Sequence, residues 1–346
     1  MQVNAITYNF KQKRVAFRKV ELEIPEGCAI VKTIMCGVCR TDLEIIDGYS
    51  GAPPPGSDEI ILFHEACGMV EEDPSGLFRR GSLVVPTVRR GCSMCQNCKK
   101  GRSDYCLTGL FKERGIYKLN GFGSEYFAEK SENLVNVNGL KPKEAILVEP
   151  LSIISKAYER FLFETDYLTR FSEEDHILVV GIGCIGQLAI RYLSQKGFEV
   201  DAWDIVDPTC KKVRLAEPYI RKYENFYEKP KEKYPIIFEC SGSSKAIDYI
   251  IRKTCKNNGI IIQIGIPASS YLINLSDSIK QLVLKNISLI GVVNSCKKHF
   301  EEAVELIRNK KIKVSDIVTN VYKANNIENA LKEKDPCNIV KKAIKW

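Results

Sequence analysis

Four cysteines stand in one short run of the chain, and their spacing suits a metal. The run is Cys92-x2-Cys95-x2-Cys98-x7-Cys106, inside the polar, basic segment RRGCSMCQNCKKGRSDYC. Two residues between sulfurs let neighbouring thiolates turn onto one small cation, and the longer loop closes the fourth side, as in a closed structural zinc site. The alternative is a set of disulfides, which suits short secreted chains rather than a chain of 346 residues. We therefore predict a structural zinc ion on these cysteines.

A second set of potential metal ligands is mixed in type. Cys39, His64 and Glu65 lie in the first part of the chain, and Glu149 precedes Pro150. One thiolate, one imidazole and carboxylates form an open set, and a catalytic zinc keeps one position for water or substrate. A lone cysteine or histidine in an apolar segment more often belongs to a core. Together with the four-cysteine run, these residues predict a catalytic zinc site.

A glycine-rich turn indicates a dinucleotide. The residues Gly181-Ile-Gly183-Cys184-Ile185-Gly186 follow the apolar run ILVV and open the segment IGQLAIRYL, which has helical spacing. The first glycine permits the tight turn, the second lets a pyrophosphate approach the backbone, and the third lets helix and strand pack closely. The free N–H groups at the helix start then face the phosphates. A glycine-rich turn without a ligand is the weaker alternative in this context.

The next strand favours NAD over NADP. Asp204 ends the run EVDAWDI, about 20 residues after the glycines, where an acid accepts hydrogen bonds from the adenosine ribose and repels a 2′-phosphate. Asp201 is the competing acid, but strand alternation places it away from the tip. Lys211 and Lys212 follow and keep NADP as the alternative.

The pattern of elements changes near residue 150. Short β-like runs broken by Gly and Pro fill the first part, for example Ala29–Ile34, Ile60–Phe63, Ser82–Val85 and Glu125–Phe127. A helix is expected over residues 154–170. After it, apolar strands alternate with helical segments, which indicates a parallel sheet covered on both faces. The expected strands are His176–Val180, Glu199–Ile205, Ile236–Cys240, Ile260–Ile264 and Ser288–Val293. We therefore predict an α/β protein with a β-rich catalytic domain at 1–153, a doubly wound nucleotide domain at 154–294, and a C-terminal segment at 295–346 that returns to the first domain.

The composition excludes several function classes. Hydrophobic residues make up 45% and charged residues 27%, and no run approaches the roughly 20 apolar residues that span a bilayer. No signal-peptide pattern stands at the start, so a cytoplasmic protein is expected. The net charge is +8, but the Lys and Arg residues are interspersed with Asp and Glu. The Lys-Lys pairs that begin at residues 99, 211, 297, 310 and 341 are therefore interpreted as solvated surface rather than as a nucleic-acid site. Scattered cysteines such as Cys184 and Cys240 are expected to be buried thiols.

The motifs resemble those of a known family. GVCRTD, HEACG, the four-cysteine loop, the Glu149-Pro150 pair and GIGCIG occur in the order found in zinc-dependent medium-chain alcohol dehydrogenases. The stretches GIYKLNGF, WDIVDPT and GVVNSCKKHFEEAV are most similar to the archaeal glucose 1-dehydrogenases of that family. The resemblance covers nearly the whole chain and implies a GroES-like domain followed by a Rossmann domain.

The resemblance also implies roles for individual residues. The catalytic zinc would be held by Cys39 and His64, with Glu65 and Glu149 in the same site, and Thr41 would relay a proton. Glu113 and Asn294 would face a sugar together with Thr41, Glu65 and Glu149, and Asn294 also belongs to the cofactor site. The expected reaction is oxidation of an aldose at C1 to the lactone, with hydride transfer to NAD(P)+. The alternative is a polyol or simple alcohol as substrate, and a homo-oligomer, dimer or tetramer, is expected through residues near 271–295.

The chain departs from this family at a few positions. Val88 replaces the Asn that precedes RRGC in sugar-binding relatives, and Phe63 replaces the usual Gly before His64. NADP-accommodating relatives carry Asn-Arg-Arg where this chain has Asp204-Ile205-Val206. His299 is interpreted either as a residue near the sugar or as the exposed start of a helix.

Overall fold

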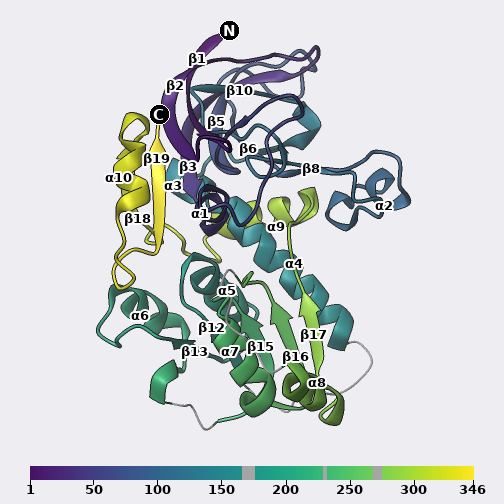
Figure 1. Cartoon of the computed structure of the whole chain (residues 1–346), viewed down its shortest axis with the longest axis vertical. Coiled ribbons are helices and arrows are strands. Elements are labelled where there is room, and N and C mark those ends of the chain that lie inside the picture. The colour runs from purple at the N-terminus through teal and green to yellow at the C-terminus, as the bar shows by residue number, and fades with distance from the viewer. Residues whose placement is uncertain (166–175, 229–231, 268–274) are drawn as a thin grey trace. The chain divides into compact units, whose positions relative to one another are not determined.

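The computed structural model describes residues 1–165, 176–228, 232–267 and 275–346 (Figure 1). The chain divides into two compact units. The first contains residues 1–152, 294–334 and 341–346, and the second contains residues 153–293 and 335–340. Each unit is described by itself.

The first unit is built mostly on antiparallel strands. Its larger sheet has the order β11-β6-β5-β3-β19-β18, with β10 also paired to β3. These strands are β3 (Ala29–Val38), β5 (Glu65–Glu72), β6 (Leu83–Pro86), β10 (Tyr126–Glu129), β11 (Leu134–Asn136), β18 (Val318–Lys323) and β19 (Lys341–Lys345). Strand β3 alternates fully buried residues with less buried ones over its first half, so one face packs on the core. The C-terminal β19 pairs with β3, so the last strand of the chain lies in the same sheet as a strand from its first 40 residues (Figure 1).

Smaller elements complete this unit. One three-stranded sheet consists of β2 (Arg14–Glu21), β1 (Gln2–Asn9) and β4 (Glu59–Ile61), and another of β7 (Arg89–Arg90), β8 (Lys112–Arg114) and β9 (Lys118–Leu119). The helices are α1 (Arg40–Ile46), α2 (Gln96–Lys99), α3 (Pro142–Ala145), α9 (Lys297–Arg308) and α10 (Ile327–Lys332). Helix α4 (Val148–Thr165) begins in this unit and continues into the other. It starts six residues before the predicted Ile154, and its predicted end at 170 lies outside the described residues.

Within its described residues, the second unit contains a parallel sheet of six strands. The strands are β12 (Ile177–Val180), β13 (Val200–Asp204), β14 (Lys222–Asn225), β15 (Tyr234–Glu239), β16 (Cys255–Gln263) and β17 (Ser288–Gly291), in the order β14-β13-β12-β15-β16-β17. Numbered along the unit this order is 3-2-1-4-5-6, that of doubly wound dinucleotide-binding folds. The central β12 and β15 are buried throughout, as a covered parallel sheet requires. The helices are α5 (Cys184–Gln195), α6 (Lys211–Ala216), α7 (Ser244–Tyr249), which continues as a π-helical turn (Ile250–Thr254), and α8 (Leu275–Leu284).

One disulfide corrects the expectation for the cysteines. Cys210, at the start of α6, is bonded to Cys337 across 127 residues of sequence. Both half-cystines belong to the second unit. Cys184 and Cys240 are thiols, as expected, but both are only half-buried. Their apolar neighbours in sequence suggested deeper burial than the start of α5, where Cys184 lies, and the end of β15, which Cys240 follows, provide.

Among the described residues, no helix combines the length and the apolar character that crossing a bilayer needs.

Candidate functional site

Strand pairing brings three predicted zinc ligands together. In the β3–β5 ladder Gly37 lies opposite Glu65, so Cys39, two residues after Gly37, comes close to the start of β5. His64 stands at a bend just before β5, rather than inside a strand as its apolar neighbours suggested. One potential ligand atom of each of Cys39, His64 and Glu65 lies within 4.8 Å of the others. A thiolate, an imidazole and a carboxylate this close form a donor set that fits zinc.

Asp42 contacts two residues of this cluster, Cys39 and His64. Its Oδ2 accepts a 2.7 Å hydrogen bond from the backbone N–H of Cys39, and its Oδ1 lies 3.7 Å from His64 Nδ1. Burial raises the pKa of Asp42 to about 6 against the opposing effect of His64. Burial alone would lower the pKa of His64, but the Cys39 thiol and the nearby carboxyl groups raise it well above its usual value. A site that favours positive charge on a buried imidazole also favours a metal cation.

Glu65 has a buried cationic partner that the sequence did not reveal. Lys341 Nζ, on β19, donates a hydrogen bond of 2.5 Å to the Glu65 carboxylate. The Lys341 and Glu65 side chains are 4% and 1% exposed, so the expectation of a solvated Lys-Lys pair at 341 is wrong for Lys341. A Cβ on Gly37 would lie 2.0 Å from Glu65 Oε2, so only glycine leaves room for this carboxylate.

The remaining catalytic candidates lie beside this cluster. Glu149 is the second residue of α4 and is buried. Burial raises its pKa to about 7, and the charges of His64 and Glu65 act on it in opposite directions, so it lies near both. It is absent from the group of atoms within 4.8 Å. The Thr41 hydroxyl is 3.7 Å from Cys39 Sγ and half-buried.

Phe63 explains why a glycine is usual before the histidine. Its φ is +69°, in the left-handed region that glycine favours. Gly115, Gly121 and Gly123 pack against its backbone and ring so closely that a Cβ on any of them would lie within 2.8 Å of a Phe63 atom. The surrounding glycines thus hold a conformation that is unfavourable for a bulky residue.

The four-cysteine run, residues 92–106, forms a small lobe in which the four half-buried thiols lie together. The four sulfurs lie within 4.8 Å of one another, and Sγ of Cys92 and Cys98 are 3.8 Å apart. Four thiolates about 2.3 Å from one zinc would stand roughly 3.8 Å apart. Hydrogen bonds, the largest from Thr108, lower the pKa of Cys92 to about 5. The donor set and its spacing therefore fit a zinc ion.

The side chains of a third group of buried potential ligands make structural hydrogen bonds. Asp104, Cys296 and His299 have ligand atoms within 4.8 Å. His299 Nδ1 accepts the Cys296 N–H at 3.1 Å and so caps α9, while both Asp104 oxygens accept hydrogen bonds from the Arg102 guanidinium. His299 is 2% exposed, so its interpretation as the exposed start of a helix is wrong.

The predicted sugar contacts Glu113 and Asn294 meet each other. Asn294 Nδ2 donates a 2.7 Å hydrogen bond to Glu113 Oε1. Asn294 has a φ of +60°, which asparagine tolerates better than most residues. Val88 is only 2% exposed, so its apolar side chain belongs to the core.

The glycine-rich turn has the geometry that a dinucleotide site needs. Gly181 has a φ of +87°, and a Cβ on Gly186 would lie 1.7 Å from the Gly181 carbonyl oxygen. A Cβ on Gly183 would meet nothing within 4 Å, so this turn leaves open space against the backbone for a phosphate. Cys184 and Ile185 form the first turn of α5. The cradle fits a pyrophosphate.

Asp204 lies at the tip of β13, next to this turn. Its Oδ2 accepts the Ile182 N–H at 2.7 Å and its Oδ1 accepts the Ile205 N–H at 2.6 Å, so the carboxylate is already oriented. Each oxygen keeps a second lone pair. Asp201 is 1% exposed and bonded to Arg221 and Tyr234, so it is not available to a ribose.

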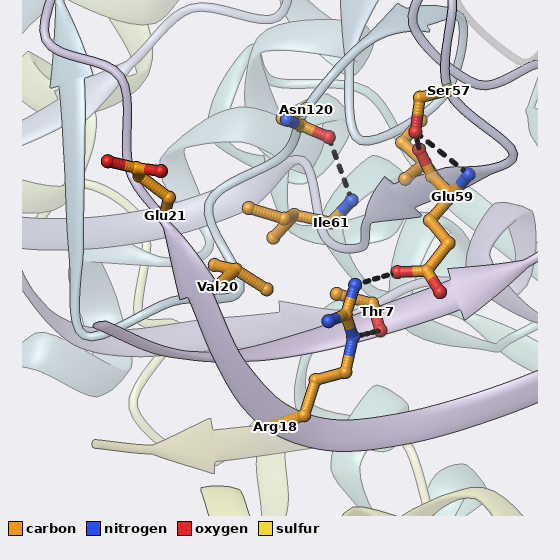
Figure 2. A pocket seen from close by; sticks show the side chains of 9 residues that line it. Thr7, Arg18, Val20, Glu21, Ser57, Glu59, Ile61 and Asn120 are labelled. Carbon is orange, nitrogen blue, oxygen red and sulfur yellow. Dashed lines mark hydrogen bonds and ion pairs between the residues drawn. The ribbon is translucent and has the colours of Figure 1, made fainter. Parts of the chain in front are cut away.

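A cavity of about 250 Å³ opens elsewhere on the first unit. Figure 2 shows its polar wall, where Arg18 contacts Glu59 and Thr7, and where Asn120 accepts the Ile61 N–H at 3.0 Å. None of the predicted site residues lines it. Its lining includes no potential metal ligand other than carboxylates, so it lacks the mixed donor set of the Cys39 cluster.

Comparisons with known proteins support one family. The family described as "Glucose dehydrogenase C-terminus" matches residues 143–346, and "Alcohol dehydrogenase GroES-like domain" matches residues 25–139. Similar curated proteins include glucose 1-dehydrogenases of Methanocella arvoryzae (35% identical, 85% of each chain covered) and Metallosphaera sedula (34% identical, 94% and 93% covered).

Solved structures agree on the fold. A glucose dehydrogenase of Haloferax mediterranei, solved with NADP, Zn and gluconolactone, has a TM-score of 0.86 at 28% identity over 99% of each chain. These matches confirm the predicted α/β fold class, with a GroES-like domain and a parallel-sheet nucleotide domain.

Proposed function

Since the chain belongs to the zinc-dependent medium-chain alcohol dehydrogenase family, among relatives of the archaeal glucose 1-dehydrogenases, we propose that it oxidises an aldose at C1 to the aldonolactone. The hydride passes to a nicotinamide dinucleotide. The observation that carries the proposal is the buried cluster of Cys39, His64 and Glu65 in a chain that also presents a carboxylate–amide pair, Glu113 and Asn294. A simple-alcohol pocket would be mostly apolar.

We assign the catalytic metal to Cys39, His64, Glu65 and Glu149. Zinc bound there supplies Lewis-acid chemistry that lowers the pKa of a substrate hydroxyl. Asp42 orients Cys39 and His64, and Lys341 orients Glu65. The Thr41 hydroxyl, close to the Cys39 sulfur, carries the proton away. A second zinc in the lobe of Cys92, Cys95, Cys98 and Cys106 is structural.

The cofactor site is assigned to Gly181, Gly183, Cys184, Ile185, Gly186 and Asp204. The role of Asn294 as a further cofactor contact, which the family resemblance implied, stays a prediction. NAD is favoured because Asp204 is held by two backbone N–H groups with a lone pair left on each oxygen for a ribose hydroxyl. The Haloferax mediterranei relative was solved with NADP, so NADP is the alternative. The Asp204→Ala variant is expected to narrow the ratio of kcat/KM for NAD over NADP. Equal use of both cofactors by the wild type would contradict this preference.

The substrate is tested with a panel of aldoses, polyols and simple alcohols, with each cofactor, before and after chelation. Activity on aldoses that chelation abolishes and zinc restores is the expected result. Oxidation of simple alcohols but of no aldose would contradict the sugar assignment. Since Val88 is apolar and buried, an aldose other than glucose, such as a pentose or an epimer, belongs in the panel.

We also propose a homo-oligomer. Exposed apolar side chains gather on α8 and β17 of the second unit, namely Leu275, Ile279, Val283, Leu284 and Leu289. Monomeric proteins seldom leave such a group uncovered. The predicted contact region, 271–295, lies partly outside the described residues. The domain limits 1–153, 154–294 and 295–346 and the cytoplasmic location remain predictions.

A further inference from the structure

The Glu113 carboxylate is held on one side only. Its Oε1 accepts hydrogen bonds from Arg89 Nε at 3.0 Å and from Asn294 Nδ2 at 2.7 Å, and it forms an ion pair with Arg89 Nη2 at 2.9 Å. Its Oε2 makes no hydrogen bond with any residue that the structure describes. The carboxylate is therefore fixed in orientation, and one oxygen remains to accept a hydrogen bond from a ligand hydroxyl.

Arg89 is itself fixed from several sides. It lies opposite Glu113 in the β7–β8 pair, and its guanidinium carbon stands 3.9 Å above the centre of the Phe111 ring. Its Nη1 donates to the backbone carbonyl of Asp104 at 3.2 Å, within the four-cysteine lobe between Cys98 and Cys106. The Arg89 and Glu113 side chains are only 8% and 12% exposed. A planar guanidinium is suited to make such bonds in fixed directions.

The polar network continues from Asn294 toward the metal-ligand cluster. Asn294 Oδ1 accepts the Ser295 N–H at 2.8 Å, and the Ser295 and Ser152 hydroxyls are 2.7 Å apart. The Ser152 hydroxyl donates to the carbonyl oxygen of Glu149 at 2.5 Å. All these residues belong to the first unit. One hydrogen-bonded chain thus joins the lobe to the backbone of Glu149, with Glu113 Oε2 as its open acceptor.

From this chain of contacts we propose that Arg89 is the positioning residue for sugar recognition: it fixes Glu113 so that Oε2 accepts a sugar hydroxyl, and it anchors that geometry to the four-cysteine lobe. The proposal rests on the proposed aldose dehydrogenase function. On this proposal the four-cysteine lobe has a role in sugar recognition besides its structural one, because the Asp104 carbonyl in the lobe fixes the position of the Arg89 guanidinium. Arg89 acts through Glu113 and is not assigned a contact with substrate.

The test compares variants of the metal-loaded enzyme in steady-state kinetics with the best aldose of the wild type. Arg89→Met is expected to raise KM for the sugar roughly 10- to 100-fold, the value of a charge-assisted hydrogen bond, with kcat at saturation within about threefold. The sugar KM of Arg89→Lys should fall between those of the wild type and Arg89→Met, since an ammonium cannot make all the contacts that the guanidinium makes with Glu113 and Asp104. Calorimetric binding of glucono-1,5-lactone should weaken in parallel with KM.

Two further variants separate positioning from general damage. Arg90→Met is the matched control, because the adjacent Arg90 is also largely buried but pairs with Glu129 instead. It is expected to lower thermal stability and to leave sugar KM within about twofold. If Arg89 acts through Glu113, Arg89→Met/Glu113→Gln should be no worse in KM than Glu113→Gln alone.

The opposite results would overturn the proposal. These are an unchanged sugar KM in Arg89→Met, an equal rise in Arg90→Met, or multiplied effects in the double variant. If Arg89→Met does not fold, Arg89→Gln carries the same comparison. If the wild type oxidises aldoses but the Arg89 variants keep the wild-type sugar KM, the Arg89 proposal fails and the proposed function stands. If the wild type oxidises no aldose, the proposed function and the Arg89 proposal both fail.

Discussion

Replacing Lys341 by methionine is expected to destabilise the first unit by several kcal/mol. Lys341 Nζ lies 2.5 Å from the Glu65 carboxylate, and both side chains are almost completely buried. With an effective dielectric constant of about 20, unit charges at that distance attract each other by about 7 kcal/mol, and desolvation offsets much of this. Removing one partner leaves the other charge buried and unpaired, which costs about 3–5 kcal/mol.

The assay is urea unfolding at pH 7, with chelator and with added zinc. Lys345→Met, an exposed lysine on the same strand, is the matched control and should change the free energy of unfolding by no more than about 0.5 kcal/mol. Lys341→Met/Glu65→Gln should recover most of the loss in chelator, because no unpaired charge remains. A loss below about 1 kcal/mol in Lys341→Met, or no recovery in the double variant, would refute the role of the ion pair.

Three other perturbations test separate parts of the structure. Burial alone would raise the pKa of Glu129, but Arg90 and Arg114 lower it to about 2. Glu129→Gln should therefore cost about 3 kcal/mol above pH 4.5, and the difference from wild type should shrink as the pH falls toward 2 in acid-unfolding titrations. Gly183→Val should leave the melting temperature nearly unchanged, because a Cβ meets nothing there, but should weaken dinucleotide binding in calorimetry at least about tenfold. Cys210→Ser opens a disulfide that spans 127 residues and should lower the free energy of unfolding by about 4 kcal/mol, and a reductant should destabilise the wild type but not the variant.

Local patterns in the sequence predicted the parts of the site that are built locally. The four cysteines lie within 15 residues, so their spacing alone brings the sulfurs to one point. The glycine turn is likewise a strand, a turn and a helix in immediate succession, and the structure places β12 and α5 on its two sides. The apolar strands β12, β13, β15 and β17 were predicted to within two residues at each end, because a covered parallel sheet needs continuous apolar runs. Strand β16 begins at Cys255, five residues before the predicted Ile260, and the more polar β14 was not predicted.

Residues that act across long separations left no such pattern. Lys341 is 276 residues from Glu65, and its sequence context, KKAIK, has the composition of a solvated strand end. Lys341 is buried because β19 pairs with β3, a contact between segments far apart in the sequence. His299 was ambiguous for a related reason, since its capping of α9 depends on a Cys296 N–H rather than on a familiar Ser or Thr cap. The Cys210–Cys337 disulfide joins two segments that show no common motif.

The C-terminal part of the chain therefore supplies the residues that orient the carboxylates of the candidate site. The first 65 residues supply Cys39, His64 and Glu65. A segment near residue 294 supplies Asn294, and the last strand supplies Lys341. Asn294 contacts Glu113 and Lys341 contacts Glu65, so each carboxylate is synthesised well before the residue that orients it. A chain that ended before residue 294 would keep the zinc-ligand types and lose the groups that orient Glu65 and Glu113. Metal binding alone would then be a poor measure of a competent site, and sugar KM is the quantity that reports whether the late residues have closed it.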